Sequence, residues 1–241
     1  MSRIYEPYRR QIVTAEIIES LKRRHSGNLE IINGVLRDLY YGGTGAPVTG
    51  TGLVTADITE MFLRRVLSMD SGFAPFTVEE LEESFRNRHL VMFKGSEKEF
   101  YLGGKIDRID EKDGIKRLID YKTGTADTDV DSLEDLFNSN GKKLNSAVVQ
   151  TMIYCVIMTG RVGYERMRPV IYGLRSGSIS DFDDRIMVGG VPVDDFSQVS
   201  GTFGKLLNNT LESIFDPTEP FTMTPVVDRC LYCPFKNLCQ R

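Results

Sequence analysis

The stretch from Gly103 to Gly124 constrains the fold of this 241-residue chain more than any other. It contains two short runs of alternating polar and apolar residues, separated by a Glu-Lys-Asp-Gly turn. Such runs, joined by a short glycine-containing loop, are typical of a β-hairpin. The apolar residues that define the two strands are Ile106, Ile109, Ile115, Leu118 and Ile119.

Three charged residues are expected to meet on this hairpin. Asp107 and Asp120 lie on opposite strands and can converge, and Lys122 points to the same side as Asp120 because side chains alternate along a strand. Divalent cations such as Mg²⁺ prefer carboxylate oxygens, and a lysine can orient a metal-bound water. The same residues could also be solvated charges on an ordinary hairpin.

The complete string favours the first interpretation. Gly-x-x-Asp-Arg-Ile-Asp, a short turn and then Ile-Asp-Tyr-Lys-Thr-Gly closely resembles the nuclease motif of the RecB-like branch of the PD-(D/E)XK superfamily. The resemblance implies that Asp107 and Asp120 bind Mg²⁺ or Mn²⁺ and that Lys122 assists the attacking water. It also implies a restriction-endonuclease-like α/β fold, a mixed central sheet flanked by helices. The neighbouring residues expected to contact DNA are Lys105, Arg108 and Tyr121.

Composition is that of an ordinary globular chain, with 41% hydrophobic and 27% charged residues. We expect a single nuclease-like domain over residues 1–241. The net charge of −4 provides no overall attraction for DNA, so contacts would come from a local basic patch. No stretch approaches the roughly 20 apolar residues of a membrane span, and the start lacks a signal-peptide core, so a cytoplasmic location without a membrane partner is expected. The predicted patch comprises Arg86, Arg88, Lys94, Lys105 and Arg108.

Residues 1–75 are predicted to form a mostly helical subregion. Thr14 can cap a first helix that ends near His25, a second helix begins at Asn28, and a third covers residues 55–69. The glycine-rich segment 41–52 lacks the Gly-Lys-Ser/Thr ending of a phosphate-binding loop, so a connecting loop is expected there.

Residues 76–122 are predicted to be mainly strands. For residues 76–83 the pattern allows either a helix with a capping box at Thr77-x-x-Glu80 or a strand, and we favour a strand. Residues 90–93, 100–110 and 115–122 then form an antiparallel meander. An acidic loop to Asn140, with a short helix over 133–137, is expected to follow.

The most apolar predicted helix covers residues 144–158 and is expected to pack against the sheet. Gln150 and Tyr154 lie on one face of it, at i and i+4. They could be a buried polar pair that satisfies its own hydrogen bonds. By resemblance they match the Gln-x-x-x-Tyr motif of RecB-like nucleases, which faces the active site and DNA. Strands over 168–174 and 185–188, and a helix over 196–215 interrupted by Gly201 and Gly204, complete the prediction.

The tail, residues 226–241, carries Cys230, Cys233 and Cys239, a spacing that suits a loop around a metal or cluster. Incidental free thiols are the alternative. AddB-type nucleases end in a similar pattern, which together with one distant cysteine binds a [4Fe-4S] cluster. The only other cysteine, Cys155, lies inside the apolar helix, where a small buried side chain is the commoner explanation.

The RecB-like pattern also includes an upstream histidine, in a setting like Gly-x-x-x-His, that this sequence lacks. His25 and His89 are the only histidines, and neither matches that setting. Tyr5-Glu6-Pro7-Tyr8 resembles the segment that comes after the histidine helix in relatives. We therefore expect that the histidine and the fourth cluster cysteine belong to an upstream portion of a longer protein.

Together these features predict a metal-dependent, exonuclease-like deoxyribonuclease. The resemblance implies a helicase domain or subunit as its partner in double-strand break repair, although no helicase motif occurs here. The alternative is an inactive nuclease-fold module for DNA binding or assembly.

Overall fold

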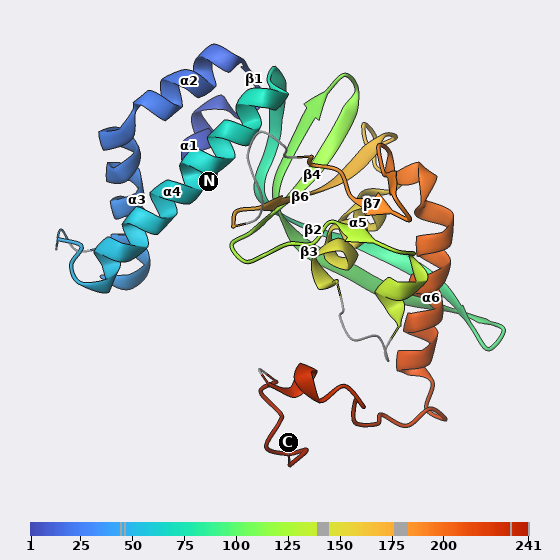
Figure 1. Ribbon diagram of the computed structural model, residues 1–241. Coiled ribbons are helices and arrows are strands. Elements are labelled where there is room, and N and C mark those ends of the chain that lie inside the picture. Colours follow the sequence, from blue (N-terminus) through green and yellow to red (C-terminus); the bar gives the residue numbers. More distant parts are fainter. Residues whose placement is uncertain (44, 46, 139–144, 176–182, 232, 241) are drawn as a thin grey trace.

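The computed structural model describes residues 1–241 except 44, 46, 139–144, 176–182, 232 and 241, and its centre is a five-stranded sheet (Figure 1). The strand order is β1-β2-β3-β4-β6; all neighbours are antiparallel except β4 and β6, which are parallel. The mixed sheet is flanked by helices, which confirms the predicted restriction-endonuclease-like α/β class. Its strands are β1 (Ile12–Val13), β2 (Phe76–Phe93), β3 (Ser96–Lys112), β4 (Ile115–Lys122) and β6 (Met167–Gly173).

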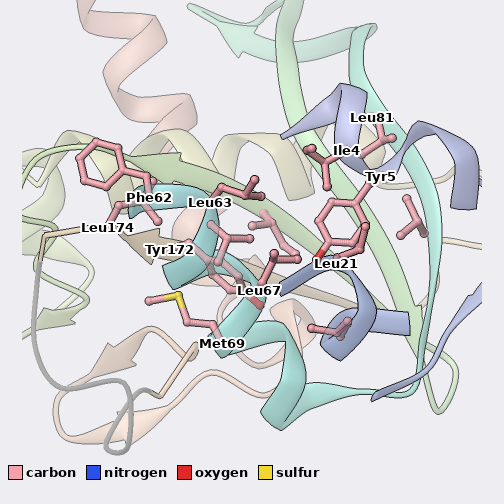
Figure 2. Packing of buried hydrophobic residues seen from close by; sticks show 14 of the residues in the cluster. Ile4, Tyr5, Leu21, Phe62, Leu63, Leu67, Met69, Leu81, Tyr172 and Leu174 are labelled. Atoms are coloured by element: carbon pink, nitrogen blue, oxygen red, sulfur yellow. The ribbon is translucent and has the colours of Figure 1, made fainter. Parts of the chain in front are cut away.

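The predicted N-terminal helices form one layer, shown in blue to teal in Figure 1. Side chains from these helices pack against β2, β4 and β6 in one hydrophobic cluster, part of which is shown in Figure 2. Thr14 caps α2 as predicted, since its side-chain oxygen accepts a hydrogen bond from the Ile17 amide. The elements are α1 (Ser2–Tyr5), the 3₁₀ turn η1 (Glu6–Tyr8), α2 (Ala15–Arg23), α3 (His25–Tyr40) and α4 (Thr51–Phe73).

The opposite face of the sheet is covered by α5 (Ser146–Met158) and α6 (Ser200–Phe215). In β4, Leu118 belongs to this second cluster while its neighbour Ile119 belongs to the first. Strands buried on both faces usually read as nearly continuous apolar runs, as most of β6 does, whereas β4 is buried although it carries Lys116, Arg117 and Asp120. Smaller elements on this side are β5 (Asp129–Val130), β7 (Met187–Val188) and β8 (Val191–Pro192), which form a second sheet, and the 3₁₀ turns η2 (Glu134–Phe137) and η3 (Phe196–Gln198).

The β2–β3 hairpin is longer than predicted. The segments expected as separate strands at 76–83 and 90–93 are one continuous strand, so the Thr77 capping-box alternative is wrong. Its partner β3 begins at Ser96 rather than Phe100. The pairing shifts by one residue between Val78 and Glu80, which is a β-bulge.

Several predicted helix boundaries need correction. α3 begins at His25, three residues earlier than expected, so His25 lies at a helix start and not at a helix end. α4 extends the third predicted helix in both directions. Gly201 and Gly204 do not interrupt α6, which runs through both. For α5, the predicted first residue Leu144 lies outside the described residues.

The C-terminal tail leaves the end of α6 and extends away from the sheet, in red in Figure 1. It contains one 3₁₀ turn, η4 (Val227–Cys230). Leu231, Phe235 and Leu238 are exposed, so these three side chains do not hold the tail against the core. Within the described part of the chain, no helix is long and apolar enough to cross a membrane.

Candidate active site

Asp107 and Asp120 lie where β3 and β4 separate. The last paired residues of the two strands are Arg108 and Ile119, and the two aspartates come one position further along. There the Tyr121 amide donates a 2.9 Å hydrogen bond to Asp107 Oδ2 rather than to the backbone of β3. The Asp107 carboxylate thus takes the place of the backbone carbonyl that would otherwise accept the hydrogen bond of the Tyr121 amide. The hairpin holds both aspartates at its open end.

Burial raises the pKa of both carboxyl groups above the ordinary value. For Asp107, burial is the largest cause; the hydrogen bond from Tyr121 opposes it, and the negative charges of Asp120 and Glu82 add to it. For Asp120, burial again dominates and the Lys122 ammonium offsets part of the effect. A bound cation would relieve both costs, because it supplies the positive charge that two adjacent buried carboxylates lack.

Lys122 lies two residues beyond Asp120 on β4, and its ammonium contacts Asp120 and a residue of α5. Its Nζ lies 2.7 Å from Asp120 Oδ2, close enough for an ion pair but not aligned for a good hydrogen bond. It also donates a 2.7 Å hydrogen bond to Gln150 Oε1. We refer to Asp107, Asp120 and Lys122 together as the acid site.

Gln150 and Tyr154 join the acid site from α5, and they also contact each other. Gln150 Nε2 donates a 2.7 Å hydrogen bond to the Tyr154 hydroxyl oxygen, so the glutamine bridges Lys122 and the tyrosine. Burial and then the charge of Asp120 raise the pKa of Tyr154, so it is protonated at neutral pH. Because its oxygen accepts from Gln150, its own hydrogen is left to donate elsewhere. The two residues are therefore both a satisfied polar pair and part of the site.

Glu82 is a neighbour that sequence reasoning missed. It lies between Leu81, paired with Arg108, and Glu83, paired with Ile106, and so stands opposite Asp107 on β2. Its backbone adopts a φ of 54°, which is uncommon for a residue within a strand. Its carboxylate forms an ion pair with Lys105. The sequence offers no way to single out this acid, because it is one of four glutamates in the run Glu79-Glu80-Leu81-Glu82-Glu83. Such a run is typical of solvent-exposed residues.

Arg108, which was predicted to contact DNA, is buried in the core and does not lie on the surface. The side chain is fully buried and donates two hydrogen bonds, of 2.8 and 2.7 Å, to the Asp70 carboxylate from α4. Arg117 likewise donates two 2.7 Å hydrogen bonds to Asp110. We refer to Asp70, Arg108, Asp110 and Arg117 as the buried ionic network. Burial alone would raise the pKa of Asp70, but the Arg108 charge and hydrogen bonds bring that pKa below its ordinary value.

The hydroxyl group of Tyr121, another residue predicted to contact DNA, also lies inside the protein. That oxygen is buried and makes no hydrogen bond within the described residues, and its ring packs edge-on against Tyr172 with centroids 5.8 Å apart. Burial raises its pKa well above that of a free tyrosine. The residue belongs to the packing between the sheet and the N-terminal helices.

The remaining members of the predicted basic patch are occupied by neighbours. Lys105 pairs with Glu82, Arg88 lies 2.8 Å from Glu99 and Lys94 lies 2.9 Å from Asp216. Arg86 stacks on the Tyr101 ring at 4.1 Å. These side chains are exposed, but most of their charge is matched locally, so they do not form a strong basic patch.

The histidines and cysteines lie away from the acid site. His25 contacts Glu60 of α4, and His89 of β2 contacts Asn208 of α6. Cys155 is fully buried in the core, where burial raises the pKa of its thiol. The three tail thiols are free and partly exposed. Across the described residues, no three His, Cys, Asp or Glu side chains are grouped to hold a metal ion.

The fold agrees with a comparison against protein families. The sequence model of the PD-(D/E)XK nuclease superfamily matches residues 28–240. The chain belongs to this superfamily, whose members are nucleases that act on DNA and generally use divalent metals. No curated protein matches the chain.

Proposed function

We propose that this chain is a divalent-metal-dependent nuclease that hydrolyses DNA phosphodiesters at the acid site. The observation that carries the proposal is the meeting of Asp107, Asp120 and Lys122 at the open end of the β3–β4 hairpin. Their order along the chain, with Gln150 and Tyr154 following on α5, is that of the RecB-like motif. Superfamily membership independently supports a hydrolytic nuclease.

The acid site fits a hard divalent cation. Asp107 accepts the hydrogen bond from the Tyr121 amide through Oδ2, and Asp120 faces it from β4. Carboxylate oxygens are the ligands that Mg²⁺ and Mn²⁺ prefer, and Mg²⁺ commonly uses one or two carboxylates together with waters and substrate phosphate. When bound, such an ion polarises a phosphate oxygen and lowers the pKa of a water. Asp107 and Asp120 would hold it.

The other residues supply positive charge and a proton donor. The Lys122 ammonium is held between Asp120 and Gln150, where it can stabilise negative charge developing on the phosphate or orient the attacking water. Tyr154 keeps a hydroxyl hydrogen to donate to a phosphate oxygen or water. Gln150 acts as a positioning residue, because its amide fixes both of these groups.

The narrower assignments rest on the sequence resemblance. We propose a RecB-like, AddB-type domain with exonuclease-like action, working in the cytoplasm with an ATP-dependent helicase in double-strand break repair, and we take residues 1–241 as one nuclease-like domain. A [4Fe-4S] cluster on Cys230, Cys233 and Cys239 stays a prediction. It needs a fourth ligand, since three thiolates leave one iron open, and Cys155 could serve only if the core around it opened. Iron counting after anaerobic reconstitution would test it.

An inactive nuclease-fold module is the second candidate. It is favoured by one observation, that both histidines are engaged elsewhere and neither reaches the acid site, whereas the RecB-like motif includes a histidine. The module would bind DNA without cutting it.

The test compares two substitutions on one hairpin, Asp120→Asn at the open end and Asp113→Asn in the exposed turn. Asn tolerates the left-handed backbone at position 113, so this control preserves the turn. With Mg²⁺ or Mn²⁺ and end-labelled DNA, we expect Asp120→Asn to lower the cleavage rate about 10³-fold or more. Asp113→Asn should cut like the wild type.

Thermal melting of both variants must show an intact fold. Wild-type cleavage by Asp120→Asn would contradict its role as a metal ligand. If the wild-type protein binds DNA but cuts neither single-stranded nor double-stranded DNA with Mg²⁺ or Mn²⁺, the inactive module would be favoured.

A further inference from the structure

Asp107 has a carboxylate neighbour on each side. The strand order places β3 between β2 and β4, so Glu82 of β2 stands on one side of Asp107 and Asp120 of β4 on the other. Burial is the largest cause of the raised pKa of Asp107, and the charges of Asp120 and Glu82 add to it, which shows that both acids lie close to Asp107. Negative charge therefore borders Asp107 in two directions.

Lys105 supplies positive charge on the β2 side. It lies two residues before Asp107 on β3, so the two side chains point to the same face of the sheet. Its ammonium forms an ion pair with Glu82. The hydrogen bond to Glu82 is the largest cause that raises the pKa of Lys105, and the charge of Asp107 adds to it. We refer to Glu82 and Lys105 as the flanking pair.

The flanking pair repeats, on the β2 side of Asp107, the arrangement found on the β4 side. On the β4 side, Lys122 Nζ lies 2.7 Å from Asp120 Oδ2. The two pairs differ in exposure, because the side chains of Lys105 and Glu82 are 54% and 43% exposed whereas that of Asp120 is 5% exposed. The flanking pair can therefore separate without disturbing the core.

The two sides of Asp107 resemble the frame of a site for two metal ions. In nucleases that use two ions, the ions lie about 3.5–4 Å apart. Residues directly opposite each other on antiparallel strands have Cβ atoms about 4.5–5.5 Å apart, so their carboxylates can share one ion. Glu82 and Asp107 stand opposite each other in this way. The partner that Glu82 has here is the Lys105 ammonium.

The backbone of Glu82 also sets this residue apart from the other glutamates of β2. Its φ of 54° lies in the left-handed region, which is unfavourable for a residue with a side chain. Residues in such conformations are found preferentially at functional sites, where the surrounding structure fixes them. A role for Glu82 beside the acid site is consistent with this strain.

We propose that the Lys105 ammonium, held by Glu82, takes the place of a second divalent cation, so that the acid site binds one Mg²⁺ or Mn²⁺ ion. This inference rests on the proposed nuclease function and adds the number of metal ions and a role for the flanking pair. An ammonium supplies positive charge to a nearby phosphate but cannot bind and activate a water as a metal ion does. Lys105 would therefore act only through its charge.

The first experiment counts Mn²⁺ ions per chain by equilibrium dialysis, without DNA. The wild type should bind one ion, whereas Lys105→Met should bind a second, weaker one, because Glu82 and Asp107 are then free to share it. The double variant Lys105→Met/Glu82→Gln should return to one ion. Lys98→Met, at an exposed position nearer the tip of the same strand, is the control and should bind as the wild type does.

Electron paramagnetic resonance shows where the second ion lies. Two Mn²⁺ ions about 4 Å apart couple magnetically, so the Mn²⁺ signal of Lys105→Met should broaden when the second ion binds. The wild type and the double variant should show the signal of isolated ions. A second ion that is uncoupled, or that persists in the double variant, would lie elsewhere and would contradict the inference.

The Mg²⁺ dependence of cleavage provides a second, kinetic readout. At low Mg²⁺, Lys105→Met should cut DNA about 10–10²-fold more slowly than the wild type, because one positive charge near the phosphate is lost. High Mg²⁺ should restore much of this rate, since a second ion can then replace the ammonium. Lys98→Met should keep the wild-type dependence. Loss of activity through misfolding would not be reversed by Mg²⁺.

The outcomes separate this inference from the proposed function. If the wild type cuts DNA but binds two coupled Mn²⁺ ions, or if Lys105→Met still binds only one, the inference is wrong and the nuclease function stands. If the wild type binds one ion and Lys105→Met two, but neither cuts DNA, the nuclease proposal fails and the role of Lys105 stands. A wild type that binds no Mn²⁺ would overturn both.

Discussion

The acid site lies on β3 and β4, as do three of the four residues of the buried ionic network, yet the charges of the two groups are balanced in opposite ways. Asp107 and Arg108 are consecutive, but Arg108 turns into the core and is bound by two carboxylates at 0% side-chain exposure. In the network, acids and guanidinium groups match in number and pair through bidentate hydrogen bonds. At the acid site two carboxylates share a single ammonium.

This difference separates charges that hold the fold together from charges that remain free for chemistry. The network joins α4 to β3 and β4, and Tyr172 of β6 donates a 2.9 Å hydrogen bond to Asp70. At the acid site burial raises the pKa of both carboxyl groups, so the fold bears a cost for keeping them ionised. Removing a network member should therefore cost stability, and removing an acid-site member should cost activity.

The largest expected effect is on stability, from Arg108→Met. This change leaves the Asp70 carboxylate buried without its main partner, which should lower the free energy of unfolding by about 3–5 kcal/mol. Arg86→Met, on the exposed part of the neighbouring strand, should change it by no more than about 0.5 kcal/mol. Urea denaturation measures both. Equal values for the two variants would remove the distinction between network and surface charges.

Arg108 also shows how far the sequence predicts this molecule. Hairpin geometry could group Asp107, Asp120 and Lys122 in advance and one turn of helix could group Gln150 and Tyr154, while the resemblance to RecB-like nucleases joined the two groups. The burial of Arg108 depends on Asp70, a residue of α4 that no local pattern links to β3. The same holds for Glu82, whose place beside Asp107 follows from the register of a long hairpin. Local patterns therefore predicted contacts within one hairpin or one helix, but contacts set by tertiary packing could be anticipated only where the family resemblance supplied them, as for Lys122 and Gln150.

At the acid site, Lys122→Met should lower the cleavage rate about 10²–10³-fold, in line with the loss of one preorganised charged group. The methionine keeps much of the side-chain volume. The affinity for Mn²⁺ should be retained, because the ammonium is not a ligand and repels the cation. Calorimetric titration of Mn²⁺ together with single-turnover cleavage separates the two quantities. Parallel loss of metal binding would contradict this division of roles.

A smaller effect is expected for Tyr154→Phe, which removes the hydroxyl group but keeps the ring. Loss of one neutral hydrogen bond corresponds to about 1 kcal/mol, or about a fivefold to tenfold slower cleavage. Tyr40→Phe, at a side chain that is 74% exposed, is the control. If Tyr154→Phe cuts DNA at the wild-type rate, the hydroxyl group is not needed for cleavage and the ring serves only in packing against Gly104.

The smallest effect is a gain in stability when Asp120 is neutralised. Because the folded pKa of Asp120 is raised, the native state binds more protons than the unfolded state from about pH 3.8 up to the raised value, and over that interval stability falls as pH rises. Asp120→Asn imitates the protonated form. At pH 7 without metal it should be more stable than the wild type by about 1 kcal/mol or less, since one pKa unit corresponds to about 1.4 kcal/mol. Below pH 3.8 the gain should vanish, because the wild-type carboxyl is then protonated in both states.

The matched comparison is Asp110→Asn in the buried ionic network. Asp110 is paired with Arg117, so its neutralisation should destabilise the fold. A gain in stability equal to that of Asp120→Asn would show that the network and the acid site do not differ as described.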